Sequence, residues 1–140
     1  MKIFLDANVL VAVLNKEYPV FSYASRILSL ADHPQHTLYT SPVCLAIAYY
    51  FAEKKTSAHA AKNKISILLE HIKIAENSKN AILKTLENKK ILDFEDGLEY
   101  YAALENKCDC IVTENLKDFH FSEIQVVNCK DFALKYFVKS

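Results

Sequence analysis

The sequence predicts an α/β fold of three layers, with a central parallel five-stranded sheet between two layers of helices. Short apolar runs of strand length alternate along the chain with longer stretches of helical periodicity. This alternation is typical of βαβ units, whose helices cover both faces of a parallel sheet. A chain of 140 residues can bury a core without disulfides or metals, so we expect a single domain over residues 1–140.

The first half of the chain predicts strands over residues 3–5, 37–40 and 72–75. Helices are predicted over residues 8–15, 18–31, 42–55 and 57–70. The second helix stops at His33, because the residue before Pro34 is disfavoured in helical conformation. Ser41 and Pro42 fit the N-cap and first position of the third helix, which is apolar nearly all round and is therefore expected to be central to the fold.

The second half predicts helices over residues 78–88 and 93–107, strands over residues 110–113 and 123–127, and a final helix capped by Asp131. The inward side of helix 93–107 is assigned to Leu98, Tyr101, Ala102 and Leu104. The helical hairpin over residues 41–70 is longer than a minimal crossover, which distinguishes the pattern from a plain flavodoxin-like fold.

Composition excludes several classes of function. Gly97 is the one glycine, so neither a G-x-G-x-x-G loop nor a P-loop occurs. Seventeen basic and seventeen acidic residues leave no net charge, so nucleic acid would need local help to bind. The four cysteines lack zinc-ligand spacing and are predicted to be buried free thiols. Polar residues interrupt the apolar N-terminus and no other run is of membrane-spanning length, so we expect a cytoplasmic protein without membrane contact.

Acidic residues follow two predicted strands and open one helix. Asp6 ends the first strand, Asp93 and Asp96 begin helix 93–107, and Asp118 follows the fourth strand. Each acid alone also fits a helix cap or a turn. Together at the carboxyl edge of a parallel sheet they would repel one another, and a hard cation such as Mg²⁺ or Mn²⁺ would remove that repulsion. Such a site suits hydrolysis of phosphodiester bonds.

Three segments resemble the motifs of PIN-domain proteins, a family of metal-dependent ribonucleases that includes toxins of bacterial toxin–antitoxin pairs. They are FLDANVLV, LDFEDGLEYYAAL and IVTENLKDF, and the resemblance covers essentially the whole chain. It implies Asp6, Asp96 and Asp118 as catalytic metal ligands for Mg²⁺ or Mn²⁺, with Asp93 as a further ligand. Supporting roles fall to Asn8, Thr113 and Asn115.

One position departs from the family pattern. Ile47 aligns with a metal-site Glu that many members carry on the helix after the second strand. Glu53 points to another side of that helix, whereas Lys54 returns to the face of Ile47. Lys54 is therefore assigned to substrate binding, although a solvated helix end also explains it. Lys117 is assigned to the same role.

The resemblance implies endoribonuclease activity that leaves a 5′-phosphate. We expect an RNA substrate, an antitoxin partner whose arginine would block the acidic pocket, and a homodimer. The alternative is a catalytically weak or inactive domain that binds RNA or protein, and the sequence motivation for it is Ile47. A phosphorylated receiver domain is disfavoured, because only Asp6 follows the first strand where paired acids are needed.

Four tyrosines and one histidine have a functional interpretation beside a structural one. Tyr49, Tyr50, Tyr100 and Tyr101 would stack on bases or pack in the core, and their helical positions favour the core. His120 lies beside Asp118 and would assist proton transfer, although a metal-activated water does not require it.

Overall fold

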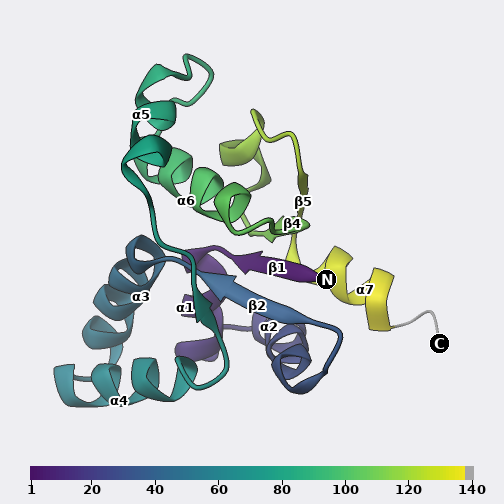
Figure 1. The fold of residues 1–140 in the computed structure, drawn as a ribbon. Helices are drawn as coiled ribbons and strands as arrows, with labels where there is room; N and C mark the ends of the chain where they lie inside the picture. The colour runs from purple at the N-terminus through teal and green to yellow at the C-terminus, as the bar shows by residue number, and fades with distance from the viewer. Residues whose placement is uncertain (138–140) are drawn as a thin grey trace.

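The computed structural model describes residues 1–137 and contains one sheet of five parallel strands in the order β3-β2-β1-β4-β5 (Figure 1). Its strands are β1 (Lys2–Leu5), β2 (Thr37–Thr40), β3 (Lys73–Ile74), β4 (Cys110–Val112) and β5 (Gln125–Val127). The predicted three-layer α/β/α architecture with a parallel five-stranded sheet is confirmed.

Strand register brings the ends of β1 and β4 together. Leu5 pairs with Val112 across these neighbouring strands. The backbone N–H of Asp6 donates to the carbonyl of Val112 at 3.0 Å, one position beyond the regular pairing. Asp6 and Thr113, the next residues along the two strands, therefore emerge side by side at the carboxyl edge.

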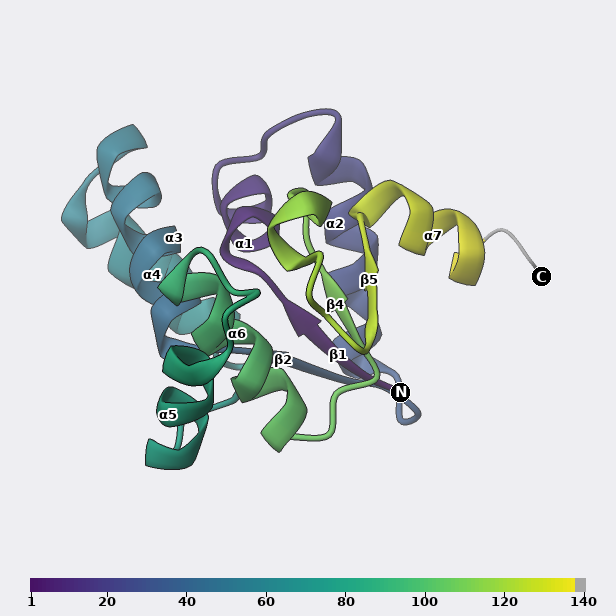
Figure 2. The ribbon, with the colours of Figure 1, turned by 90° about the horizontal axis from the view of Figure 1, so that it is seen from above.

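Helices cover both faces of the sheet (Figures 1 and 2). On one face lie α1 (Ala7–Leu14) and α2 (Val20–Leu28), and α7 (Cys129–Phe137) packs against α2. The other face is covered by α6 (Phe94–Glu105), with α5 (Lys79–Glu87) packed on its outer side. A hairpin of α3 (Pro42–Lys55) and α4 (Ala58–Leu68) packs against α1 through α3. Two short 3₁₀ helices, η1 (Ser29–Asp32) and η2 (Leu116–Phe119), complete the described elements.

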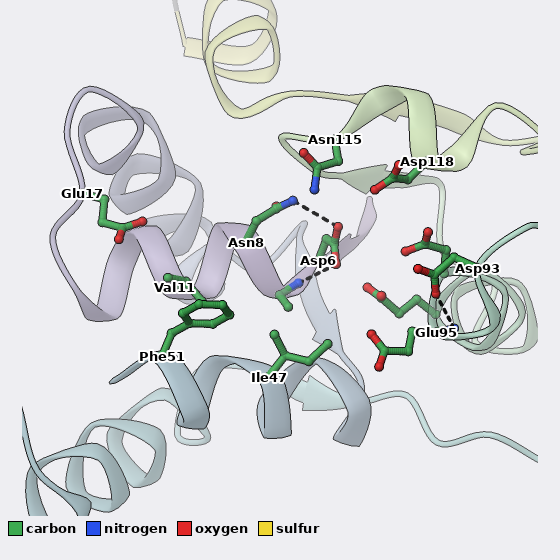
Figure 3. A pocket seen from close by; sticks show the side chains of 13 residues that line it. Asp6, Asn8, Val11, Glu17, Ile47, Phe51, Asp93, Glu95, Asn115 and Asp118 are labelled. Carbon is green, nitrogen blue, oxygen red and sulfur yellow. Dashed lines mark hydrogen bonds between the residues drawn. The ribbon is translucent and has the colours of Figure 1, made fainter. Parts of the chain in front are cut away.

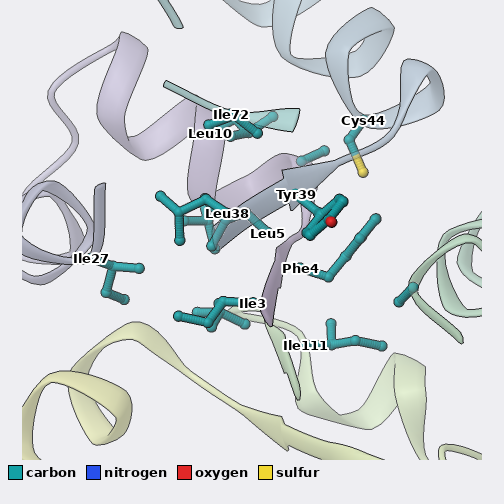
Figure 4. Packing of buried hydrophobic residues seen from close by; sticks show 14 of the residues in the cluster. Ile3, Phe4, Leu5, Leu10, Ile27, Leu38, Tyr39, Cys44, Ile72 and Ile111 are labelled. Carbon is teal, nitrogen blue, oxygen red and sulfur yellow. The ribbon is translucent and has the colours of Figure 1, made fainter. Parts of the chain in front are cut away.

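The central strand is buried on both sides, as expected for a parallel sheet with helices on each face. Phe4 and Ile111 pair in register and point to one side, whereas Ile3 points to the side of Ile27 and α2 (Figure 4). These four side chains, and that of Leu5, have no exposed surface. Burying each contributes about 1.5–3 kcal/mol of transfer free energy, so the three apolar residues before Asp6 anchor the edge of the site.

Although α3 is apolar nearly all round in composition, only one of its faces is buried. Its buried face consists of the small residues Cys44, Ala48 and Ala52, while Tyr50 and Phe51 are 53% and 45% exposed. Small side chains allow α3 to approach α1 closely, and the larger apolar residues that dominate its composition lie mostly at its flanks.

Several predicted boundaries shift by a few residues. The second helix ends at Leu28 and continues as η1. The last helix begins at Cys129 rather than after Asp131, because Asn128 Oδ1 accepts a hydrogen bond from the Asp131 N–H at 2.7 Å and so acts as the cap. Asp131 instead lies in the first turn of α7, where its charge suits the helix dipole.

The four cysteines are free and buried, as predicted. Within residues 1–137, no helix combines the length and the apolar character needed to cross a membrane.

Candidate functional site

A pocket of about 450 Å³ opens at the carboxyl edge of the sheet (Figure 3). It contains six of the predicted site residues: Asp6, Asn8, Asp93, Asp96, Asn115 and Asp118. The remaining lining residues are Ala7, Val11, Glu17, Ile47, Phe51, Glu95 and Glu99. The structure thus brings together acids that are up to 112 positions apart in the sequence (Asp6 and Asp118).

Asp6 is buried and fixed at both carboxylate oxygens. Oδ1 accepts from the N–H of Ala7 at 2.6 Å, so Asp6 does cap α1, as its alternative interpretation predicted. Oδ2 accepts from Thr113 Oγ1 at 2.7 Å and from Asn8 Nδ2 at 3.3 Å. These donors stabilise the charged carboxylate and hold its orientation toward the pocket.

The supporting residues form a network between the ends of β1 and β4. Asn8 Nδ2 also donates to Thr113 Oγ1 at 3.2 Å, and Asn8 Oδ1 accepts from the N–H of Glu114 at 3.1 Å. Thr113 Oγ1 accepts from the N–H of Asn115 at 3.0 Å. Thr113 is fully buried and does not line the pocket, so its contribution there is made through Asp6.

Asp93 and Asp96 enter the pocket from the start of α6. Asp93 is the N-cap, and its Oδ1 accepts from the N–H of Glu95 at 2.9 Å. Asp96 lies in the first helical turn and is half-buried. Asp93 thus caps α6 and also lines the acidic pocket, so the helix-cap and the pocket interpretations of this residue both hold.

The charge of Asp96 is poorly tolerated in the absence of a cation. Burial, followed by the neighbouring charges of Asp93, Asp118 and Asp6, raises the pKa of Asp96 to about 7. Repulsion among carboxylates was the basis on which the sequence predicted a metal site, and this repulsion adds to burial in raising the pKa of Asp96.

Glu99 is an acid of the pocket that the sequence reasoning missed. Its side chain is 2% exposed, and its Oε1 accepts from Cys44 Sγ at 2.9 Å. Ligand atoms of Asp6, Cys44 and Glu99 all lie within 4.8 Å of one another. Burial and contact with Asp6 raise the pKa of Glu99 to about 11.

A sequence signal for Glu99 existed. It lies three residues after Asp96, a spacing that places two side chains on the same face of a helix. The predicted inward face of α6 was displaced by about one position: the buried residues are Gly97, Glu99, Tyr100, Ala102 and Ala103. Leu98, Tyr101 and Leu104 are only partly buried.

The turn after β4 places Asn115 and Asp118 at the upper wall of the pocket in Figure 3. The N–H of Asp118 donates to the carbonyl of Asn115 at 3.1 Å, which closes the turn leading into η2. Lys117 lies in this turn but lines an adjacent pocket rather than the acidic one. His120 is exposed and its Nδ1 contacts the carbonyl of Lys117 at 3.3 Å.

The α3 wall of the pocket is apolar. Ile47 points from α3 toward Asp6, and Phe51 lies beside Val11 (Figure 3). Lys54 does not line the pocket, and its Nζ lies 5.2 Å from the centre of the Tyr50 ring. Glu53 accepts from Tyr49 OH at 2.9 Å and is likewise absent from the lining.

The predicted core packing of the tyrosines holds for only part of the group. Tyr100 is 3% exposed, Tyr49 and Tyr101 are half-buried, and Tyr50 is exposed.

The donor set fits a hard divalent cation. Oxygen ligands of carboxylates are those preferred by Mg²⁺ and Mn²⁺. Along the described part of the chain, residues 1–137, no basic side chain lines the pocket to neutralise Asp6, Asp96, Glu99 and Asp118. A cation would supply the missing positive charge.

The fold and the pocket together define an α/β domain with a carboxylate-lined site where its central strands end. The family model for the PIN domain matches residues 2–117. The chain therefore belongs to the PIN-domain family, and the resemblance noted from its motifs is confirmed.

Solved structures of VapC-type proteins share this fold. VapBC2 from Rickettsia felis, bound to a promoter DNA fragment, is 24% identical with a TM-score of 0.71, covering 91% of this chain and 98% of that one. VapBC-1 from nontypeable Haemophilus influenzae is 18% identical with a TM-score of 0.72, covering 93% and 99%. VapC20 from Mycobacterium tuberculosis, described as a sarcin–ricin loop cleaving toxin, is 15% identical with a TM-score of 0.66, covering 88% and 98%. No curated protein matches the chain by sequence at a significant level.

Proposed function

We propose that this protein is a Mg²⁺- or Mn²⁺-dependent endoribonuclease. The observation that carries the proposal is the convergence of Asp6, Asp96 and Asp118 in one pocket at the carboxyl edge of the sheet, without a basic side chain among its described lining. Membership of the PIN-domain family supports it.

The roles of the acids follow from how each is held. Asp6 is the most rigid, because Thr113, Asn8 and the N–H of Ala7 fix its two oxygens. Asp96 and Asp118 face it from α6 and from the turn after β4. When bound, the cation would neutralise these charges, polarise a phosphodiester and lower the pKa of a water.

The protein's own groups would then position the substrate. Without a cation, the pocket repels phosphate, so RNA binding at this site would be coupled to metal binding. Asp93 and Asn115 at the rim would orient water and substrate by hydrogen bonding. Lys117, in the turn beside Asp118, would bind the phosphates of the RNA backbone near the pocket. Lys54 would contact the RNA only if the bound RNA continued over α3.

A role as the toxin of a toxin–antitoxin pair is the biological form of this proposal. The fold is shared with VapC20, which is described as a toxin that cleaves the sarcin–ricin loop, and with the VapBC structures. An antitoxin segment that inserts an arginine into the acidic pocket would compete with the metal and the RNA. Association as a homodimer and a cytoplasmic location are further parts of the proposal.

Cleavage of RNA by the wild type and Asp6→Asn tests the nuclease. Single-stranded RNA should be cut in Mn²⁺ and left intact in EDTA. Asp6→Asn removes a ligand charge and should reduce the rate by more than about 100-fold, since even partners outside the ligand shell are worth about 10–100-fold. Equal rates for the two proteins would refute the proposed site, and cleavage that persists in EDTA would refute metal dependence.

The alternative is a domain that binds RNA or protein without cleaving. Ile47 favours it, because an apolar side chain occupies the wall where many family members carry a metal-site Glu. Calorimetric titration with Mn²⁺ separates the two: a binding module should show no metal uptake that depends on Asp96. RNA binding without cleavage and without Asp96-dependent uptake would establish the alternative.

A further inference from the structure

Among the described residues, the Glu99 carboxyl group has only a weak hydrogen-bond donor to account for its burial. Its Oε1 receives a hydrogen bond from the Cys44 thiol, a weak donor, and its other close neighbour is the Asp6 carboxylate, which is an acceptor. Two facing acceptors need a proton or a cation between them. The ordinary cost of burying a carboxyl group is therefore left largely uncompensated by the described side chains around it.

Glu99 also has the position that a ligand would need. Asp96 precedes it by three residues on α6, and the ligand atoms of Glu99 and Asp6 lie within 4.8 Å. All three acids line the same pocket. An ion bound by Asp6 and Asp96 would thus have Glu99 beside it.

We propose that Glu99 is a direct ligand of the divalent cation, supplied by α6 to a pocket whose α3 wall carries the apolar Ile47. The inference rests on the proposed function, because it adds a ligand to the same metal site. Cys44 is then a positioning residue: hard cations prefer oxygen to sulfur, so its thiol orients Glu99 while the carboxylate binds the ion.

The proposal explains how a pocket with Ile47 in its wall remains suited to a cation. Ile47 points toward Asp6 from the opposite helix (Figure 3). A carboxylate placed at position 47 would enter the same space. The two positions should therefore substitute for one another, whereas they would be unrelated if Glu99 were only a packing residue of Cys44.

Mn²⁺ titration of the metal-free full chain tests this directly. Glu99→Gln keeps the size of the side chain and an acceptor for Cys44, and it should weaken Mn²⁺ binding by at least about tenfold. Glu95→Gln is the matched control: it makes the same replacement of a carboxyl group by an amide in the same helix and the same pocket, but at an exposed position. It should weaken binding several-fold less.

Two further variants separate a ligand from a structural acid. Glu99→Asp keeps the carboxyl group but withdraws its oxygens by one methylene, so a ligand role predicts weaker binding although the carboxyl group is retained. Ile47→Glu added to Glu99→Gln should recover at least about threefold of the lost affinity, since it returns a carboxylate to the pocket. Thermal unfolding in EDTA verifies that each variant is folded before its affinity is interpreted.

The outcomes distinguish this proposal from the broader one. Wild-type Mn²⁺ uptake that Asp96→Asn abolishes and Glu99→Gln leaves intact would overturn the role of Glu99 and leave the nuclease standing. Equal losses in Glu99→Gln and Glu95→Gln would mean that any carboxyl group of the pocket contributes alike, and would also overturn the role of Glu99. No uptake by the wild type, together with no RNA cleavage, would overturn the metal nuclease and the Glu99 ligand with it.

Discussion

Thr113 Oγ1 donates a 2.7 Å hydrogen bond to Asp6 Oδ2, and so ties the end of β4 to the end of β1 inside the acidic network. The two residues are 107 positions apart in the sequence, so their contact depends on the tertiary fold. The pairing of Leu5 with Val112 makes the contact possible, because it brings the next residue of each strand to the same level of the sheet edge. The orientation of Asp6 is therefore set by the pairing of β1 with β4.

Replacing Thr113 should impair metal binding without removing a ligand. Thr113→Val keeps the shape of the side chain but leaves Asp6 Oδ2 with only the longer bond from Asn8. Loss of a partner outside the ligand shell predicts about 10–100-fold weaker Mn²⁺ binding or slower RNA cleavage. Removing a buried donor should also lower the free energy of unfolding by about 1–3 kcal/mol.

Thr113→Ser is the control for that substitution, because it retains the hydroxyl. Mn²⁺ calorimetry and urea denaturation in EDTA measure the two effects separately. If Thr113→Val bound Mn²⁺ as tightly as Thr113→Ser, the hydrogen bond to Asp6 would have no part in forming the site.

The metal-free protein should lose stability as the pH rises from about 4 to about 8. The pKa of Asp96 is raised to about 7 in the folded protein from 3.8 when exposed. Between these values the folded state keeps a proton that the unfolded state has released, so the free energy of unfolding falls with pH. The contribution is complete below pH 4 and disappears above the folded pKa.

Asp96→Asn isolates this effect from the other titrating groups. Urea denaturation in EDTA should give a shallower fall with pH for Asp96→Asn than for the wild type. Saturating Mn²⁺ should add stability chiefly at the high end of the range, where the carboxylates are free of protons to bind it. Parallel pH profiles for the two proteins in EDTA would contradict the raised pKa of Asp96, which burial and the charges of Asp93 and Asp118 produce.

Much of this architecture could be predicted because strand patterns and chain order carry it. The apolar run before Asp6 and the run before Thr113 each end at the same edge of a parallel sheet, so their meeting follows from topology. Glu99 was not predicted as a site residue, because a single glutamate in a helix is usually exposed to solvent. Its buried position involves a contact with Cys44 of α3. That contact is between two helices, and neither helix alone predicts it.

The buried face of α3 could not be predicted for a related reason. Apolar content predicted a central place in the fold but did not indicate which face is buried. Burial follows the small residues Cys44, Ala48 and Ala52, which recur every four positions. Close approach of two helices selects small side chains over the most apolar ones. The neighbouring helices, chiefly α1 and, at Cys44, also α6, therefore decide which face is inside.

The native protein should be unreactive toward a thiol reagent such as Ellman's reagent. Burial raises the pKa of the thiol to about 12 for Cys108 and for Cys110, and also raises the pKa of Cys44 and Cys129. A thiolate is the reactive form, so low exposure and high pKa act together. The folded chain should react at none of the four cysteines within the time that the urea-unfolded chain reacts at all of them. Rapid labelling of a thiol in the native state would contradict the buried positions.

Gly97 should resist replacement even by alanine, although alanine favours helices. It lies in α6 directly after Asp96, and a Cβ there would overlap Thr85 Cγ2 of α5 and approach Ile91 Cγ2 to 2.9 Å. Overpacking of this kind costs about 1–3 kcal/mol. That range exceeds the gain of about 1 kcal/mol from helix propensity, so Gly97→Ala should lower the free energy of unfolding.

Thr85→Ser removes the obstructing methyl and keeps the hydroxyl that donates to the Ala81 carbonyl. Urea denaturation of the two single variants and the double variant measures this coupling. Thr85→Ser should lower the free energy of unfolding less in the Gly97→Ala background than in the wild type. Strictly additive effects would mean that α5 does not set the size limit at position 97.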